Sequence, residues 1–172
     1  MTIEPIKTFR LTLRGFKKDD AMWAYSIWND PKMGEYLPDE AKDEIDYDYV
    51  KELENLGDDN ECCYMIPVLK KNDERVGTCS LMFSEDKTVC DIAYCVHENY
   101  QGNGYATEIA LGMIGYAREQ GAEKVTIRVN EENGPSNSVA QKCGGRIVGE
   151  KMFQKQGTDT MMKELLYEVN LK

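Results

Sequence analysis

Alternating apolar and polar residues predict the first strand of this chain. In the segment FRLTLRGF (residues 9–16), Phe9, Leu11 and Leu13 alternate with arginine and threonine side chains. This period of two is typical of a strand with one buried face. We therefore expect a half-buried strand over this segment.

Two segments with helical spacing of apolar residues come next. We expect a short helix over residues 17–31, with Asp19 or Asp20 as its N-cap and Pro31 as its stop. A second helix is expected over residues 43–57, where apolar side chains recur every three or four positions. Its predicted buried face consists of Ile45, Tyr49, Leu53 and Leu56.

Three further strands are expected over residues 62–69, 72–83 and 87–96. The short connections between them favour an antiparallel meander. The first of the three should bury Tyr64, Ile66 and Val68 on one face. It also contains Pro67, which has no N–H to donate and therefore predicts an edge strand or a bulge.

A longer helix follows a glycine-containing segment and ends at Gly121. Its predicted buried stripe consists of Tyr105, Ile109, Met113 and Ala117. Gly112 and Gly115 weaken a helix by about 0.8–1.0 kcal/mol each relative to alanine, so we expect them to allow close packing on the sheet. The next strand, over residues 123–130, should run parallel to the strand before the helix, because a helical crossover joins them.

A short helix and two strands complete the pattern. The helix begins at Pro135 and Ser136 and ends at Gly144, and strands follow over residues 146–153 and 163–171. The expected order is β-α-α-β-β-β-α-β-α-β-β. This order predicts an α+β fold with a mixed, mostly antiparallel central sheet flanked by helices, in a single domain over residues 1–172.

Composition narrows the classes of partner. The net charge of −10 disfavours nucleic acid and anionic membranes, and it suits a cationic partner such as an amine. The first residues lack the apolar block of a signal peptide, and no apolar run is long enough to span a bilayer. We therefore expect a soluble, cytoplasmic protein.

The six cysteines form no C-x-x-C pair and no histidine–cysteine spacing typical of zinc sites. Most lie in apolar strands, where a reduced cysteine behaves as a small hydrophobic residue. We expect core packing, with no metal site and no disulfide framework.

The segment Gln101-Gly102-Asn103-Gly104-Tyr105-Ala106 is the main candidate for ligand binding. Glycines allow positive φ and a close approach to the backbone, and the free N–H groups of a first helical turn attract anions. A diphosphate would suit this site, although residues 88–117 contain no lysine or arginine. A plain turn explains the segment equally well, whereas a dinucleotide or P-loop fold lacks its remaining motif residues.

Two parallel strands with this loop between them can splay to admit a ligand. Residues 91–145 resemble the core of the Gcn5-related N-acetyltransferase (GNAT) superfamily. Its acyl-CoA signature [QR]-x-x-G-x-[GA] is met by Gln101, Gly104 and Ala106. The resemblance implies a GNAT fold in which two splayed parallel strands form the acyl-CoA cleft.

A second segment of the superfamily often reads N-x-x-S-x-x-V-x-E-K-x-G-F. The matching positions here are Asn133, Ser136, Val139, Gln141, Lys142 and Gly144, with glutamine in place of glutamate and Gly145 in place of phenylalanine. The segments FRLTLRGFKKDDA, WNDP and GYATEIA together resemble the RimJ/RimL-type branch. The similarity covers nearly the whole chain.

The resemblance implies that acetyl-CoA is the co-substrate and lies between the splayed strands. Backbone N–H groups of residues 101–106 would meet its diphosphate, with a possible hydroxyl from Thr107. Its pantetheine would pair with the backbone next to the loop, and a backbone N–H there would stabilise the oxyanion. The implied binding residues are Tyr94, Cys95, Val96, Gln101, Gly102, Asn103, Gly104, Tyr105, Ala106, Thr107, Asn133 and Ser136.

The acid and base are harder to assign. Many relatives place a tyrosine acid in the second segment, where this chain has Ala140, so Ser136 is considered as its substitute. Asp91, Glu35 and His97 are candidate bases, since an alkyl amine is mostly protonated at neutral pH. Each of the four also has a plain structural interpretation, as a helix cap, a surface acid or a loop residue.

The resemblance places the acceptor over residues 28–48 and 152–162, where acids and aromatic residues suit a cationic amine. We expect an N-acetyltransferase that moves the acetyl group from acetyl-CoA to a primary amine of a protein N-terminus or a small molecule, by direct attack. A monomer or a homodimer fits equally well. A non-catalytic acyl-CoA-binding or sensing module remains the alternative, and a domain that binds no CoA is a third possibility.

Overall fold

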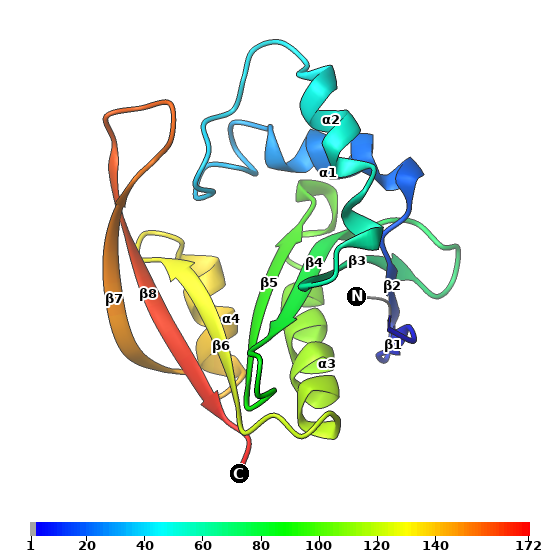
Figure 1. Ribbon diagram of the computed structural model, residues 1–172, viewed down its shortest axis with the longest axis vertical. Helices are drawn as coiled ribbons and strands as arrows, with labels where there is room; N and C mark the ends of the chain where they lie inside the picture. The colour runs from blue at the N-terminus through cyan, green and yellow to red at the C-terminus, as the bar shows by residue number, and fades with distance from the viewer. Residues whose placement is uncertain (1–2) are drawn as a thin grey trace.

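The computed structural model describes residues 3–172, which form one eight-stranded sheet in the order β1-β2-β3-β4-β5-β6-β8-β7 (Figure 1). The strands are β1 (Ile6–Lys7), β2 (Leu11–Gly15), β3 (Cys62–Leu69), β4 (Gly77–Phe83), β5 (Val89–Val96), β6 (Lys124–Asn130), β7 (Arg146–Gln154) and β8 (Met161–Asn170). The α-helices are α1 (Ala21–Trp28), α2 (Tyr47–Leu53), α3 (Tyr105–Glu119) and α4 (Gly134–Lys142). Single 3-10 turns are η1 (Lys18–Asp20), η2 (Leu56–Asp58) and η3 (Glu98–Tyr100).

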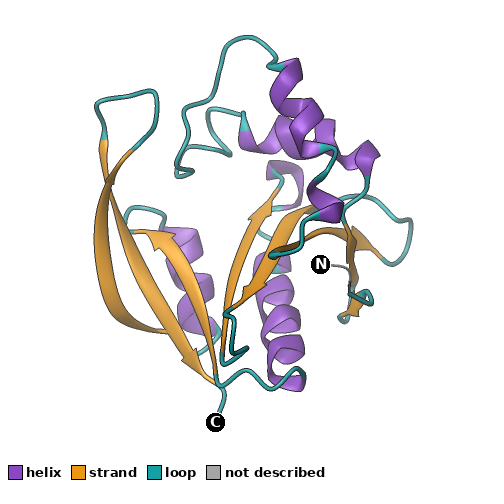
Figure 2. Cartoon of the chain, in the orientation of Figure 1, coloured by secondary structure: helices purple, strands orange, loops and turns teal. Residues whose placement is uncertain are grey.

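The expected α+β class and element order are confirmed, with the short β1 as an addition. Among the strands of residues 3–172, β5 and β6 pair in parallel and the other neighbouring strands pair antiparallel. The helices α3 and α4 lie along the strands, whereas α1 and α2 gather at one end of the sheet (Figure 2). The two faces of β3 show this division, because Cys63 and Met65 join the core under α3 while Ile66 and Val68 pack with Ala24 of α1.

The first strand differs from its predicted extent. Leu11 and Leu13 are fully buried as expected, but Phe9 is 90% exposed and precedes the strand. The chain turns at this point: the N–H of Thr8 donates to the carbonyl of Leu11 at 3.0 Å and connects β1 to β2. The alternation therefore predicted the strand correctly but included Phe9 and Arg10 of the turn and Phe16 beyond the last residue of the strand.

Asp20 occupies the N-cap position of α1, but its side chain does not cap the helix. The fully buried carboxylate instead accepts hydrogen bonds from Arg14 at 2.7 and 2.9 Å, from Arg75 at 2.8 Å and from the N–H of Lys17 at 2.8 Å. Asp20 thus joins β2, α1 and the segment before β4.

The second helix is shorter than predicted, and its buried face is shifted. It begins at Tyr47 because the Asp46 side chain accepts the N–H of Tyr49 at 3.0 Å. Val50 and Leu53 are buried, whereas the predicted Ile45 precedes the helix and is 49% exposed. Leu53 is buried and Leu56, which follows α2, packs against the same cluster, whereas Ile45 and Tyr49 are exposed, so the predicted face is confirmed at two of its four positions.

Pro67 marks a bulge inside the sheet and not an edge, because β3 lies between β2 and β4. Met65 pairs with Cys79, but Val68 bridges to Arg75, so the β4 side carries one extra residue between these two pairs. The carbonyl of Pro67 accepts the N–H of Val76 at 2.8 Å.

The helix α3 packs closely on the start of the chain. A Cβ on Gly112 would lie 2.7 Å from Thr8 Cγ2, which is closer than side chains tolerate, while a Cβ on Gly115 would meet open space. The expectation of close packing is therefore confirmed at Gly112 alone. The predicted stripe is also confirmed, with Ile109, Met113 and Ala117 fully buried.

All six cysteines are free, and four of them are buried. Burial raises the pKa of Cys63 and Cys95 to about 11, so these thiols stay protonated at neutral pH. Within residues 3–172, no helix is long and apolar enough to cross a membrane.

Candidate active site

The sheet opens between β5 and β6. Their parallel pairing runs from Val89↔Lys124 to Ile92↔Ile127 and then stops, although β5 stays paired with β4 as far as Val96. Beyond Ile92 the two strands diverge, as Figure 1 shows. The remaining part of β5 therefore presents an unpaired backbone edge, which we call the splay edge.

Hydrogen bonds on either side of β5 show which backbone groups lie on the splay edge. The N–H of His97 donates to Val76 at the β4 side, whereas the carbonyl of Thr88 accepts from Lys124 at the β6 side. Successive residues of a strand direct their N–H and C=O groups to opposite sides. The N–H and C=O groups of Tyr94 and Val96 therefore point toward the gap between β5 and β6. Cys95 points its backbone groups toward Thr78 of β4 instead.

The glycine segment lies directly above the splay edge and is exposed. Gly102 and Gly104 have φ of 76° and 78°, which a glycine adopts without strain, and Gly104 is the N-cap of α3. Gln101 Nε2 donates to the carbonyl of Val96 at 2.9 Å, and Asn103 Nδ2 donates to the carbonyls of Tyr100 and Gln101. These contacts fix the loop to the end of β5.

The backbone N–H groups of residues 102–107 have no acceptor among the described residues. They include the first turn of α3, to which Tyr105, Ala106 and Thr107 belong. Free amides at a helix start, together with the helix dipole, form a favourable site for an anion. The loop therefore has the free amides that an anion site requires, and its binding of a diphosphate stays a prediction.

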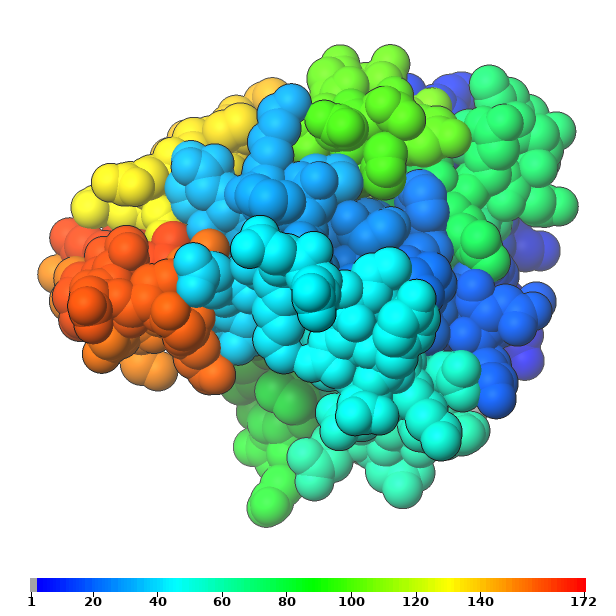
Figure 3. All heavy atoms as spheres, turned by 90° about the horizontal axis from the view of Figure 1, so that it is seen from above, coloured from blue at the N-terminus to red at the C-terminus, as the bar shows by residue number. Residues whose placement is uncertain are grey.

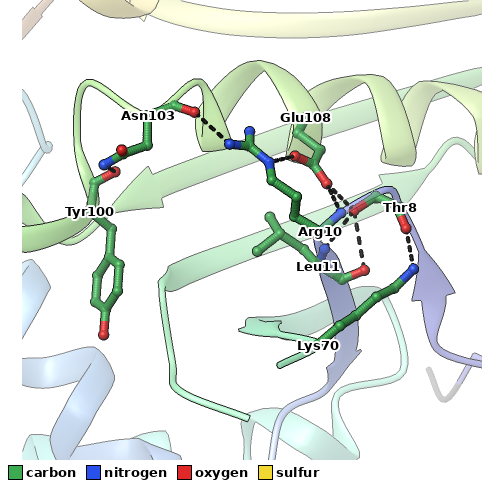
Figure 4. Close-up of polar contacts among 7 residues, drawn as sticks. All are labelled: Thr8, Arg10, Leu11, Lys70, Tyr100, Asn103 and Glu108. Carbon is green, nitrogen blue, oxygen red and sulfur yellow. Dashed lines mark hydrogen bonds and ion pairs between the residues drawn. The ribbon is translucent and has the colours of Figure 1, made fainter. Parts of the chain in front are cut away.

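Arg10 adds a cation that sequence reasoning missed (Figure 4). Its Nη1 donates to the carbonyl of Asn103 at 2.9 Å, and its guanidinium lies 4.3 Å from the centre of the Tyr105 ring. The segment around the loop contains no lysine or arginine, but β2 brings one to it from far away in the sequence. The alternation showed Arg10 only as a polar residue of the first strand, so no local signal could have identified it.

Glu108 holds Arg10 in this position. Its carboxylate accepts from Arg10 Nε at 2.7 Å, from the N–H of Arg10 at 2.6 Å and from Thr8 Oγ1 at 2.6 Å. Partial burial acts to raise the pKa of Glu108, but these hydrogen bonds and the guanidinium charge outweigh it and lower the pKa below its usual value. Lys70 also binds the carbonyl of Thr8, so the cluster joins β2, α3 and the end of β3 (Figure 4).

The opposite wall of the opening is the first turn of α4. Asn133 caps this helix by accepting the N–H of Ser136 at 3.1 Å. Ser136 Oγ lies 3.2 Å from the hydroxyl of Tyr94, so one side chain from each wall meets across the gap. Ala140, where many relatives have tyrosine, is fully buried one turn further along the helix.

A cavity of about 470 Å³ lies next to the splay edge, between β4, β5 and the helices α1 and α2. The side chain of Trp28 is fixed at its wall by a 3.0 Å hydrogen bond from Nε1 to Thr78 Oγ1. The lining residues are Tyr25, Trp28, Asn29, Leu37, Pro38, Asp39, Glu40, Lys42, Tyr49, Tyr64, Thr78, Cys79, Ser80, Ala93, Tyr94 and Cys95.

The segment between α1 and α2 closes this cavity on one side. It reaches the β7–β8 hairpin, where the N–H of Glu40 donates to Gln156 at 3.1 Å and the N–H of Gln156 donates to Pro38 at 2.8 Å. Seen from above, the blue-to-cyan segment lies against the orange hairpin (Figure 3). Two regions far apart in sequence, both predicted to border an acceptor, thus meet beside the cavity.

The three candidate bases lie away from the lining of this cavity. Asp91 accepts from Thr126 Oγ1 at 2.6 Å and pairs with Arg128 at 3.4 Å, on the part of β5 that is still paired. Glu35 lines a second cavity of about 490 Å³ near Lys155. His97 stacks on Trp23 at 4.9 Å and accepts the N–H of Asn99, so it has a structural role at the start of η3.

A sheet that opens between two parallel strands beneath a glycine loop is the arrangement that the GNAT resemblance predicts, and comparisons with known proteins identify the family. A family model described as an acetyltransferase (GNAT) domain matches residues 10–146. The chain is 25% identical to the uncharacterized N-acetyltransferase p20 of Bacillus licheniformis over an alignment of 169 residues. The match covers 88% of this chain and 95% of that protein.

Solved structures show the same fold. A GNAT-family acetyltransferase from Bacillus anthracis superimposes with a TM-score of 0.84 at 21% identity, covering 98% of this chain and 99% of that one. The spermidine N-acetyltransferase from Vibrio cholerae, in complex with CoA and spermine, superimposes with a TM-score of 0.81 at 17% identity, covering 94% of this chain and 96% of that one. The chain belongs to the GNAT family of acetyltransferases. It is an N-acyltransferase.

Proposed function

We propose that this enzyme transfers the acetyl group of acetyl-CoA to a primary amine by direct attack on the thioester. The splay edge carries the proposal, because beside a row of free loop amides it leaves the backbone groups of Tyr94 and the N–H of Val96 without a strand partner, while the Val96 carbonyl accepts from Gln101. Residues 102–107 and Arg10 would hold the diphosphate, and the splay edge would pair with the pantetheine. Asn133 and Ser136 would border the opposite side.

When bound, acetyl-CoA supplies the activated acyl group, and the backbone of β5 orients it. A backbone N–H of Tyr94 or Val96 would donate to the thioester oxygen as charge develops there. Such a donor typically contributes about 2.7–4 kcal/mol to transition-state stabilisation.

The cavity next to the splay edge suits a small cationic amine as the acceptor. Tyr25, Trp28 and Tyr64 line it together with the two acids Asp39 and Glu40. Lys42 belongs to the same lining, but its charge is paired with Asp46 at 2.6 Å. Aromatic rings and carboxylates both attract ammonium groups. Its volume of about 470 Å³ is that of a small-molecule site, and the net charge of −10 favours a polycation. The structural neighbour that binds spermine is consistent with this choice.

The amine must lose a proton before or during its attack, since an ammonium has no lone pair. Of the two acids in the lining, Asp39 is the first candidate to accept this proton directly or through water, while the Glu40 Oε2 lies beside Gly157 of the β7–β8 turn and would have to turn toward the cavity. Among the bases expected from sequence, Asp91 would act only after releasing Arg128, and Glu35 would act only from the neighbouring cavity.

Thiol release with a defined set of amines tests the proposal. Spermidine, spermine, tyramine and a serine-initiated tripeptide would each be mixed with acetyl-CoA and the enzyme. An Asp39→Asn/Glu40→Gln variant, which removes both charges but keeps the size of the side chains, is the comparison. We expect release with a polyamine, and a rise of at least tenfold in its KM in the double variant. Acetyl-CoA binding without release with any of these amines would favour the non-catalytic module instead.

A further inference from the structure

The hydroxyl of Tyr94 crosses the opening between β5 and α4. Tyr94 lies on the diverging part of β5, and its hydroxyl comes within 3.2 Å of Ser136 Oγ and 3.4 Å of the Ser136 carbonyl. The ring packs against the core under α3 and α4, so the hydroxyl is held between the two walls. A thioester arm that lies in the opening must pass this hydroxyl.

We propose that the Tyr94 hydroxyl donates a hydrogen bond to the sulfur of CoA as the thiolate leaves, and that Ser136 orients this hydroxyl. The inference rests on the proposed function. It assigns a tyrosine hydroxyl on β5 to a role for which α4 has no tyrosine. On α4, the residue one turn beyond Ser136 is Ala140, whose side chain has no polar atom. Tyr94 on β5 therefore supplies the phenolic hydroxyl that α4 lacks at Ala140.

The reaction balances with this role. The amine nitrogen forms a bond to the acetyl carbon, the carbon–sulfur bond breaks, and its electron pair stays on sulfur. The resulting thiolate accepts the hydrogen bond from Tyr94, and the proton of the amine passes to a cavity base or to water. Tyr94 keeps its own proton, because burial raises the pKa of Tyr94 to about 12, above the thiol value of about 8.5.

The groups of the described residues that act on the Tyr94 hydroxyl are uncharged, although Asp39, Glu40 and Lys42 share the lining of the neighbouring cavity. The titratable groups that influence it are Cys143 at the end of α4 and Tyr167 of β8, besides its hydrogen bond with Ser136. Burial raises the pKa of Cys143, and the Tyr167 hydroxyl donates to Asn137 Oδ1 at 2.8 Å. A thiolate here would thus find Tyr94 as its donor while the Ser136 hydroxyl donates to the Tyr94 oxygen, and a charge-assisted hydrogen bond of this kind is about twice as strong as a neutral one.

CoA itself tests the inference without any acceptor amine. Dissociation constants for CoA and for desulfo-CoA, which lacks the sulfur, would be measured by titration calorimetry between pH 6.5 and pH 10. A donor that favours the thiolate lowers the pKa of the bound thiol. CoA should therefore bind more tightly as the pH rises, by about tenfold for one pKa unit, while desulfo-CoA shows no such trend.

The variants separate the possible outcomes. We expect Tyr94→Phe to abolish this CoA-specific pH dependence, Ser136→Ala to reduce it at least twofold, and Tyr116→Phe, a control on α3, to keep it. The inference is overturned if the wild type lacks the pH dependence, or if folded Tyr94→Phe or Ser136→Ala retains all of it. If the wild type binds neither CoA nor desulfo-CoA, the proposed CoA site itself is refuted, which is a distinguishable result.

Discussion

At the scale of single residues, Arg10 connects the fold to the proposed diphosphate site. Its guanidinium is fixed by Glu108 and hydrogen-bonds the loop carbonyl of Asn103, so it both supports the loop and places a positive charge beside it. A Cβ on Gly104 would lie 3.6 Å from Arg10 Nη2, which shows how near the cation comes to the helix start.

Replacing Arg10 should therefore weaken acetyl-CoA binding. A hydrogen bond to a charged group contributes about 1.5–3 kcal/mol, so Arg10→Met should raise the acetyl-CoA Kd about tenfold or more. Arg10→Lys keeps the charge without the planar guanidinium, so its Kd for acetyl-CoA should lie between those of the wild type and Arg10→Met. Calorimetric titration measures both variants, and wild-type affinity in folded Arg10→Met would contradict this role.

Asp20 is the residue on which folding stability should depend most clearly. Burial acts to raise its pKa, but the hydrogen bonds from Arg14 and Lys17 and the charges of Arg14 and Arg75 outweigh it and lower the pKa. Asp20→Asn leaves two arginines without a counter-charge, so we expect a loss of about 3–5 kcal/mol in the free energy of unfolding. Asp19→Asn, on the exposed side of η1, is the matched control and should change it little.

The pH dependence of this loss has a definite sign. A lowered pKa in the folded state stabilises the fold above the unfolded value of about 3.9, and this stability disappears as the pH falls through the folded value. The difference between wild type and Asp20→Asn in urea denaturation should therefore be constant near neutral pH and shrink below about pH 4. A difference that grows on acidification would be inconsistent with the ion pairs.

At the scale of elements, the start of α3 depends on Gly104. With φ of 78°, a Cβ at this position costs about 1–2 kcal/mol, so Gly104→Ala should be less stable by that amount yet still fold. Gly104→Glu should also abolish acetyl-CoA binding, because its side chain brings bulk and negative charge to the loop amides. Gly115→Ala, which meets open space within the same helix, is the control for stability and binding.

The order of elements was predictable because each one has a local signal, whereas several boundaries were not. Phe9 continues the alternation but lies in a turn, and Ile45 continues a helical spacing but precedes the capping residue Asp46. In both places a local hydrogen bond ends the element before the hydrophobic pattern does. Pro67 allowed two interpretations, and only the position of β3 within the sheet decides between them.

The candidate site was predictable to the extent that it is local. The glycine loop follows from residues 101–106 because backbone amides at a helix start need no distant partner. Arg10, the contact of Tyr94 with Ser136 and the aromatic cavity arise from tertiary packing, so no spacing in the sequence signals them. His97 was a candidate for proton transfer, but its stacking on Trp23 also arises from tertiary packing and has no local signal.

At the scale of the whole molecule, the opening in the sheet separates two chemical environments. The loop side offers free amides and Arg10 to an anion, while the cavity side offers aromatic faces and carboxylates to a cation. The strand β5 borders both, so a thioester bound along it would face an amine held in the cavity. Under the proposed function, this arrangement would let an acidic protein bind an anionic co-substrate and a cationic acceptor in the same site.

Thermal unfolding with and without acetyl-CoA tests this account most directly. At a ligand concentration about 100-fold above Kd, binding to the native state adds about 2.7 kcal/mol, which for a chain of this size raises Tm by about 5–10 °C. We expect this rise in the wild type and in Gly115→Ala, and none in Gly104→Glu. An unchanged Tm of the wild type at millimolar acetyl-CoA would contradict the assignment of the opened sheet as the acyl-CoA site.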